Sequence, residues 1–220
     1  MTSSVPRDPA GAPVIVAIAM GYGHLRPAHA LAQFLGTPVL HADQPPLALG
    51  DEQRGWAAMR RLYDGVSQLS AAPLVGRPFR ALLDSVTAIP RLHPFRDLSS
   101  PDLPAHLLAL SAQRGLGRSM VSFLRAHDAP LVATFYSPAI LADYHGYGRV
   151  HCVVTDSDVQ RVWAPLHPRD TRIHYFAPSG RVARRLRAYG VPAERIDFTG
   201  FPLPHSLVGG RSRTALHRHL

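Results

Sequence analysis

Two glycines and a histidine, Gly21, Gly23 and His24, separate an apolar run from an alanine-rich stretch near the start of the chain. The apolar run, residues 14–18, is typical of a buried strand, and the alanine-rich stretch is typical of a helix. Glycines allow a ligand to approach the backbone closely, and a helix N-terminus offers free N–H groups to an anion. The imidazole of His24 can exchange a proton near neutral pH. These residues predict an anion-binding corner with a base beside it, with Tyr22 inside the loop.

A second set of candidate residues follows the apolar run 149–155. Asp156 and Asp158 stand two residues apart there, which matches the Asp-x-Asp pattern by which metal-dependent sugar transferases hold a divalent cation. The alternative is structural: Asp156 caps a turn and Asp158 is solvated. Gln160 and Trp163 follow in the same stretch. The sequence alone leaves both interpretations open.

A dinucleotide-binding site is a weaker possibility, and it would involve the end of the second predicted strand. The glycine loop departs from a dinucleotide fingerprint, because Arg26 takes the third glycine position and Pro27 follows it. Asp43, about twenty residues further on, stands where a ribose-binding acid would. Residues 199–202 are interpreted as the exit from a last strand, where glycine and proline direct the chain rather than bind a ligand.

Strands alternate with helices along the chain, which predicts an α/β, Rossmann-like fold with a mostly parallel sheet flanked by helices. Ser179 is an expected N-cap and Gly190 an expected helix stop. Ligands bind beyond the carboxyl ends of such strands. The predicted strands cover residues 13–19, 37–43, 130–136, 149–155, 172–178 and 195–200, and the predicted helices cover 25–35, 51–69, 105–126, a short stretch after Pro138, and 180–189.

The chain divides into a flexible arm at 1–12, a domain at 13–204, and the start of a linker or helix at 205–220 that stops abruptly. Within the domain, the proline-rich insertion 70–104 predicts a short amphipathic helix flanked by arginines, suited to a membrane surface or to a lid. Its apolar positions are Phe79, Leu82, Leu83, Val86 and Ile89. A further arginine cluster, Arg181, Arg184, Arg185 and Arg187, is expected to form the solvated face of the helix at 180–189.

Composition narrows the partners and the compartment. The 24 basic residues are all arginine, and with 15 acidic residues they give a net charge of +9, which suits anionic lipid head groups or phosphorylated substrates. No nucleic-acid-binding motif is present, so no nucleic-acid partner is expected. Cys152 is the only cysteine and lies in an apolar run, which predicts a buried, inert thiol. Without a signal-peptide pattern or a membrane span, a cytoplasmic protein is expected, with a peripheral position at the inner face of the membrane as an option.

Two stretches together resemble the N-terminal domain of one glycosyltransferase family. "VIVAIAMGYGHLRPAHALAQFL" is similar to the glycine loop, histidine and alanine-rich helix that open the monogalactosyldiacylglycerol synthases, the diacylglycerol glucosyltransferases and the lipid II-forming N-acetylglucosaminyltransferase. "VVTDSDVQRVWAP" and "IHYFAPSGRVARRLRAYGVPAERIDFTGFPL" are similar to the later half of that domain. The resemblance covers about residues 13–36 and 149–204 and leaves out the middle of the chain.

The resemblance implies one half of a GT-B architecture, in which two Rossmann-like domains face a cleft. The N-terminal domain of that family binds the lipid acceptor, and the C-terminal domain holds most of the nucleotide sugar. His24 is then the implied catalytic base, although Gln160 stands where many members have a histidine. The residues expected to bind substrate are Gly21, Tyr22, Gly23, Asp156, Gln160 and Trp163.

The leading hypothesis is therefore the acceptor-binding half of a glycosyltransferase that moves a sugar from a nucleotide-sugar donor to a lipid or similar acceptor. It is expected to be inactive without a donor-binding half, for which a separate subunit is one source, and to need no cofactor beyond the nucleotide-sugar co-substrate. The alternative is a non-catalytic, Rossmann-like module that binds a lipid head group, a nucleotide or a partner protein. A metal-dependent transferase using Asp156 and Asp158, and a dinucleotide-dependent oxidoreductase, follow in that order.

Overall fold

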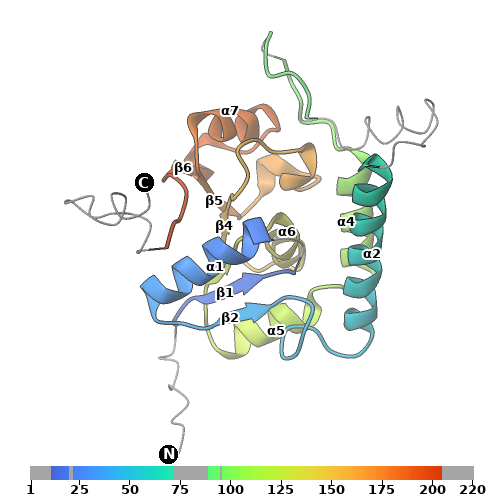
Figure 1. Ribbon diagram of the computed structural model, residues 1–220, viewed down its shortest axis with the longest axis vertical. Coiled ribbons are helices and arrows are strands. Elements are labelled where there is room, and N and C mark those ends of the chain that lie inside the picture. The colour runs from blue at the N-terminus through green and yellow to red at the C-terminus, as the bar shows by residue number, and fades with distance from the viewer. Residues whose placement is uncertain (1–10, 20–21, 72–88, 95, 205–220) are drawn as a thin grey trace, which may run out of the picture.

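The computed structural model describes residues 11–19, 22–71, 89–94 and 96–204, and these form an α/β, Rossmann-like fold (Figure 1). All the described strands run parallel in one sheet with the order β2-β1-β3-β4-β5-β6. The predicted fold class is confirmed. The strands are β1 (Val14–Ala17), β2 (Val39–His41), β3 (Leu131–Ala133), β4 (Val150–Val153), β5 (His174–Ala177) and β6 (Ile196–Phe198).

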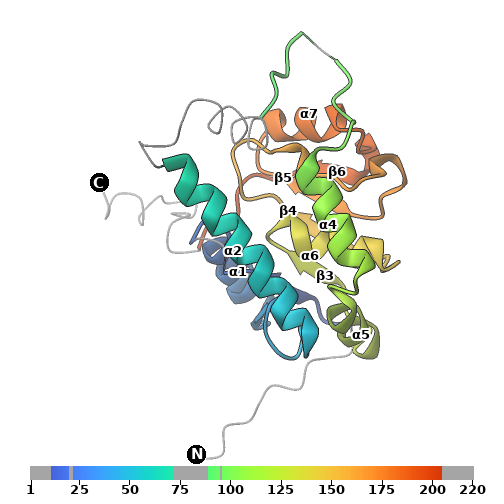
Figure 2. The same cartoon turned by 90° about the vertical axis from the view of Figure 1, so that its right-hand side faces the viewer.

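Helices flank the sheet, and the longest of them, α2, extends along one side of the molecule (Figure 2). Figure 1 shows α1 close to β1 and β2, and α7 beside β6. The described helices are α1 (Tyr22–Leu35), α2 (Asp51–Ala71), α4 (Leu103–Gln113), α5 (Arg118–Ala126), α6 (Tyr136–Tyr144) and α7 (Gly180–Ala188). No helix in the described part of the chain is long and apolar enough to cross a bilayer.

Alternate residues of β1 point into two separate cores, because successive side chains of a strand face opposite sides of a sheet. Val14 and Val16 pack in the large core that includes α6, whereas Ile15 and Ala17 pack in a smaller core with Ala28 of α1. Helices α1 and α6 therefore cover opposite faces of the sheet. The chain direction across the sheet reverses between β1 and β3, and this creates a topological switch point at their carboxyl ends.

Helix α1 begins earlier than predicted. The expected start was residue 25, after the loop, but the helix already includes Tyr22, so His24 lies in its first turn rather than in the loop before it. Pro27 lies inside the helix. Pro27 is the sixth helical residue and lacks the N–H that would bond to the Gly23 carbonyl, so α1 has one hydrogen bond fewer there.

The single helix predicted over 105–126 is wrong, because two helices, α4 and α5, occupy that range. Gly115 and Gly117 between them have left-handed backbones, with φ of +100° and +89°. A Cβ added at Gly117 would lie 2.9 Å from the Cβ of Leu141, so only glycine fits this break. The apolar periodicity continues across the break and concealed it in the sequence.

The later elements follow the predicted order with shorter strands. Ser179 caps α7, because its hydroxyl accepts a 3.2 Å hydrogen bond from the backbone N–H of Val182. Gly190, with φ of +94°, follows the end of that helix as expected. Helix α6 begins at Tyr136 and includes Pro138, whereas the helix was predicted to follow Pro138, so β3 is shorter than predicted.

Cys152 is fully buried in the large core, and burial raises the pKa of its thiol far above the ordinary value. The predicted burial of this thiol is confirmed, and the raised pKa favours the protonated, unreactive form.

Several predicted features fall outside the described residues. They include residues 1–10 of the arm, the loop residue Gly21, residues 79–88 of the predicted amphipathic helix, and residues 205–220. Of the insertion 70–104, residues 70–71 end α2 and residues 103–104 begin α4, while residues 89–94 and 96–102 form no regular element. One backbone hydrogen bond, from Leu98 N–H to the carbonyl of Ala188, ties this segment to the end of α7.

Candidate functional site

The carboxyl ends of β1, β3 and β4 bring polar side chains together at the switch point. His24 comes from the first turn of α1, Thr134 follows β3, and Thr155 and Asp156 follow β4. Ligands of open α/β sheets bind in this position. The structure therefore brings His24, from the first predicted set, next to Thr155 and Asp156 at the end of β4, which belong to the second predicted stretch.

His24 is held by both threonines. Its Nδ1 atom lies 2.6 Å from the Thr155 hydroxyl, and its backbone carbonyl accepts a 3.0 Å hydrogen bond from the Thr134 hydroxyl. The Thr155 hydroxyl donates to the Thr134 carbonyl at 3.4 Å. A hydroxyl has only one proton, so when Thr155 donates it to the Thr134 carbonyl, the Thr155 oxygen accepts a hydrogen bond from the Nδ1–H of His24. This tautomer leaves Nε2 as the unprotonated nitrogen that can act as a base.

Burial sets the charge state of the histidine and of the neighbouring carboxylate. His24 is only 7 % exposed, and burial lowers its pKa below the ordinary value of 6.5, although the nearby Asp156 carboxylate opposes this shift. Burial likewise raises the pKa of Asp156 above its ordinary value, and His24 opposes that shift. Each group thus favours the charged form of the other, which is the electrostatic arrangement expected of a base with an acidic partner.

Aromatic rings enclose the imidazole. The ring of Phe135 lies edge-on to His24 with centroids 4.5 Å apart, and the indole of Trp163 lies 6.4 Å away. Trp163 also contacts the rings of Phe135 and Tyr136. Its exposed fraction is 2 %, so in this structure it packs behind His24. Its predicted role in acceptor binding stays a prediction.

Hydrogen bonds from buried side chains hold the loop that carries Asp156, Gln160 and Trp163. Arg161, which is buried, donates hydrogen bonds to the carbonyls of Ser99, Ala164 and Pro165. The hydroxyls of Tyr175 and Tyr189 each donate a 2.8 Å hydrogen bond to loop carbonyls, those of Trp163 and Val159. These contacts satisfy loop carbonyls within the protein, and they make the loop a rigid wall of the site.

Asp158 is neither a metal ligand nor a solvated residue, and both predictions for it are corrected. Its carboxylate forms ion pairs with Arg181 and Arg185 of α7, each at 2.7 Å. Arg185 is 1 % exposed, so the prediction that this arginine cluster is a solvated face is wrong at that position. Among the described residues, no group of histidine, cysteine and acidic side chains could hold a metal ion.

Asp43 follows β2 as predicted and is buried, but an arginine pairs with it. The Nη1 atom of Arg60 in α2 lies 3.0 Å from one oxygen of Asp43, and the other oxygen has no hydrogen-bond partner. Asp43 therefore gives no further support to a dinucleotide site.

Gly23 and Gln160 complete the predicted substrate residues that the structure describes. A Cβ added at Gly23 would meet no atom within 4 Å, so packing within the protein does not require a glycine there. Gln160 is the half-buried N-cap residue of the short 3₁₀ turn Arg161–Trp163. Tyr22 is the first residue of α1.

Sequence reasoning missed Thr134 and Phe135, although both contact His24. They follow a strand that was predicted to continue through residue 136. The one available signal was a threonine after an apolar run, at the end of a strand that the fold places next to β1.

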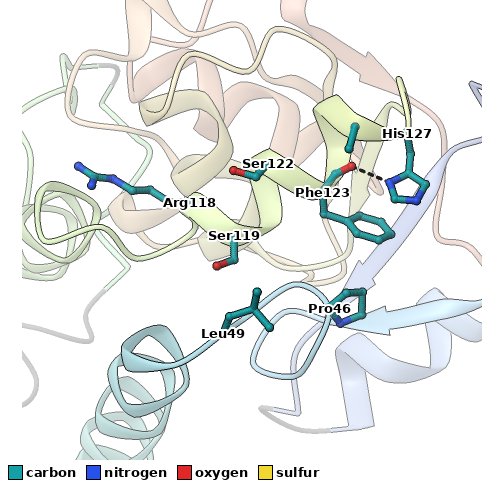
Figure 3. Close-up of a pocket in the computed structure, with 8 residues that line it drawn as sticks. Pro46, Leu49, Arg118, Ser119, Ser122, Phe123 and His127 are labelled. Atoms are coloured by element: carbon teal, nitrogen blue, oxygen red, sulfur yellow. Dashed lines mark hydrogen bonds between the residues drawn. The ribbon is translucent and has the colours of Figure 1, made fainter.

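An open hollow of about 500 Å³ lies elsewhere, between α5 and the loop before α2 (Figure 3). Pro46 and Leu49 form its lower wall in that view, and Phe123, stacked with His127, forms the upper one. None of the site residues described above lines it.

Comparisons with known proteins identify no family. The sequence matches no family model, and no curated protein and no solved structure matches it significantly. The resemblance to glycosyltransferases therefore stays a prediction, and the functional argument depends on the geometry around His24.

Proposed function

We propose that this chain is the acceptor-binding half of a glycosyltransferase that moves a sugar from a nucleotide-sugar donor to a lipid or similar acceptor. The observation that carries the proposal is the hydrogen-bonded arrangement of His24, Thr155 and Thr134 beside Asp156, at the switch point of a parallel sheet. The resemblance of the glycine loop and of the end of β4 to lipid-directed transferases supports the same assignment.

The chemistry follows from the neutral imidazole. Nε2 of His24 takes the proton of an acceptor hydroxyl as the hydroxyl oxygen bonds to the anomeric carbon of the sugar. The bond from that carbon to the nucleoside diphosphate breaks, and the diphosphate leaves with the bonding electrons. The carboxylate of Asp156 then stabilises the imidazolium, because it favours the charged form of His24.

Gly23 supports a ligand on this side of the site. The space around it is open, so the glycine serves no packing purpose inside the protein. A glycine in the first turn of α1 instead lets an acceptor approach the backbone beside His24.

A second unit supplies the donor site under this proposal. The described residues form one Rossmann-like sheet, and the GT-B arrangement needs two such units facing each other. We propose a separate donor-binding subunit or a further domain as that partner, with no cofactor beyond the nucleotide sugar.

A lipid acceptor also requires contact with a membrane, at its cytoplasmic face. Helix α4 supports this, because Leu103, Leu107 and Leu110 lie on one helical face and are all exposed. The exposed Arg91 and Arg96 precede this helix, and arginines near an apolar stripe favour anionic lipid surfaces.

Transfer assays on the assembly isolated from its own cells test the proposal. The assembly is the tagged chain together with the proteins that copurify with it. It is incubated with radiolabelled UDP-sugars and with vesicles of phosphatidylglycerol and diacylglycerol. We expect transfer by the assembly, no transfer by the chain alone, and a loss of about 10²–10⁴-fold in assemblies carrying His24→Gln. Transfer by the purified chain alone, or full activity of the variant, would contradict the proposal.

The second candidate is a non-catalytic, Rossmann-like binding module for a lipid head group, a nucleotide or a partner protein. The enclosure of His24 by Phe135 and Trp163 favours it, because buried aromatic packing can hold a histidine without any catalysis. Under this function His24→Ala leaves the activity of the assembly unchanged.

A further inference from the structure

Both carboxylate oxygens of Asp158 accept two hydrogen bonds each. Its Oδ1 accepts hydrogen bonds from Nε of Arg185 at 2.7 Å and from the backbone N–H of Val159 at 3.0 Å. Its Oδ2 accepts from Nη2 of Arg185 at 2.9 Å and from Nε of Arg181 at 2.7 Å. The two contacts with Arg185 form a bidentate pair, the geometry that best fixes a carboxylate in one orientation.

Arg185 connects three separate segments. It lies in α7, pairs with Asp158 after β4, and donates a hydrogen bond to the carbonyl of Pro90. Its side chain is 1 % exposed. If this buried guanidinium moved, it would lose its carboxylate partner and leave a buried charge unpaired. Arg185 therefore holds the carboxylate of Asp158 in one position.

Asp156 lies in the sequence between two such fixed points. Thr155 on one side is hydrogen-bonded to His24 and to the Thr134 carbonyl. Asp158 on the other side is fixed by Arg185. The intervening residues span only a short stretch of backbone, so the two anchors together restrict where the carboxylate of Asp156 can lie.

We propose that Asp158 and Arg185 are a positioning pair that keeps Asp156 beside His24. The pair acts through the backbone of residues 156–158 and is placed away from the reacting atoms. The inference concerns the electrostatic partner of His24, so it holds for a transferase and for a binding module alike.

The experiment measures the pKa of His24 by titrating its imidazole resonances in NMR spectra of the full chain. Asp156→Asn sets the reference, and we expect it to lower this pKa, because the Asp156 carboxylate raises it. Arg185→Lys keeps the charge but cannot form the bidentate pair, and Asp158→Asn keeps the shape but not the charge. We expect each to lower the pKa of His24 by at least about half of the reference shift.

Arg181→Ala is the matched control, since 63 % of the Arg181 side chain is exposed and it shares the same carboxylate. We expect it to leave the pKa of His24 unchanged. A pair that only stabilises the fold would lower the melting temperature of Arg185→Lys and Asp158→Asn without moving the pKa of His24. That outcome, in either folded variant, overturns the proposal, as does an Asp156→Asn variant with the wild-type pKa.

Discussion

Asp156 and Asp158 stand two residues apart after the same strand, yet the fold places them in opposite environments. Burial raises the pKa of Asp156, with only His24 opposing the shift. Burial also acts to raise the pKa of Asp158, but hydrogen bonds from Arg185 and Arg181 outweigh it and the pKa falls below its ordinary value. Asp156 therefore has a raised pKa, whereas two arginines hold Asp158 in its charged form.

The difference shows that a pair of acidic residues need not share one role. Asp158 has two arginine partners and contributes to the fold, whereas Asp156 interacts electrostatically with a titratable histidine and can contribute to chemistry. Perturbed carboxylates of the second kind are the ones that mark candidate functional sites.

The largest expected difference between the two residues is in stability. Asp158→Ala leaves the buried guanidinium of Arg185 unpaired and should lower the free energy of unfolding by about 3–5 kcal/mol. Asp156→Ala removes a carboxylate that burial disfavours and should change it by less than about 1 kcal/mol. Urea denaturation followed by circular dichroism checks both. Equal losses in the two variants would remove the distinction.

The pH dependence of stability should separate the residues by sign. The folded-state pKa of Asp158 lies below 3.8, so its contribution is present above that value and is lost as the pH falls through the folded pKa. The folded-state pKa of Asp156 lies above 3.8, so its contribution is present below that value and is lost as the pH rises through the folded pKa. As the pH rises from about 3 to 7, wild type should gain stability relative to Asp158→Asn and lose it relative to Asp156→Asn. Thermal melts across that range measure both differences, and parallel curves would refute the assignment.

A smaller effect is expected at His24. Wild-type His24 should titrate below 6.5 because it is buried. Loss of the Asp156 charge should lower its pKa further, since that charge favours the imidazolium. NMR titration of Asp156→Asn measures the change, and a rise in the pKa would show that the carboxylate does not support the charged imidazole.

The smallest effect is expected for Arg181→Ala. This arginine shares Asp158 with Arg185 but is largely exposed, and such pairs contribute about 0–1 kcal/mol. Arg185 should therefore matter far more than Arg181 in the same urea titration. A loss from Arg181→Ala as large as that from Asp158→Ala would mean that the exposed pair, not the buried one, fixes the carboxylate.

Much of the fold could be predicted from the sequence, because its signals are local. Apolar runs, the Ser179 cap and the Gly190 stop predicted the alternating elements and the parallel sheet. The break between α4 and α5 was missed, since the close approach of Leu141 from another helix, which leaves no room for a Cβ at Gly117, cannot be seen in the local sequence.

The candidate site was predicted only in part for the same reason. His24 and Asp156 were recognised from their positions at strand ends, and the fold brings them together. The pairing of Asp158 with Arg185 joins residues 27 positions apart. The support from Thr134 reaches His24 across 110 positions. No spacing rule within one sequence reveals such contacts, which exist only once the sheet has formed.

The most direct test of the account is the protonation state of His24 at pH 7, measured from the nitrogen chemical shifts of its imidazole. Burial predicts a neutral ring, and a Thr155 hydroxyl that donates to the Thr134 carbonyl predicts the proton on Nδ1 and a free lone pair on Nε2. A ring protonated on both nitrogens, or carrying its proton on Nε2, would contradict the assignment of His24 as a base.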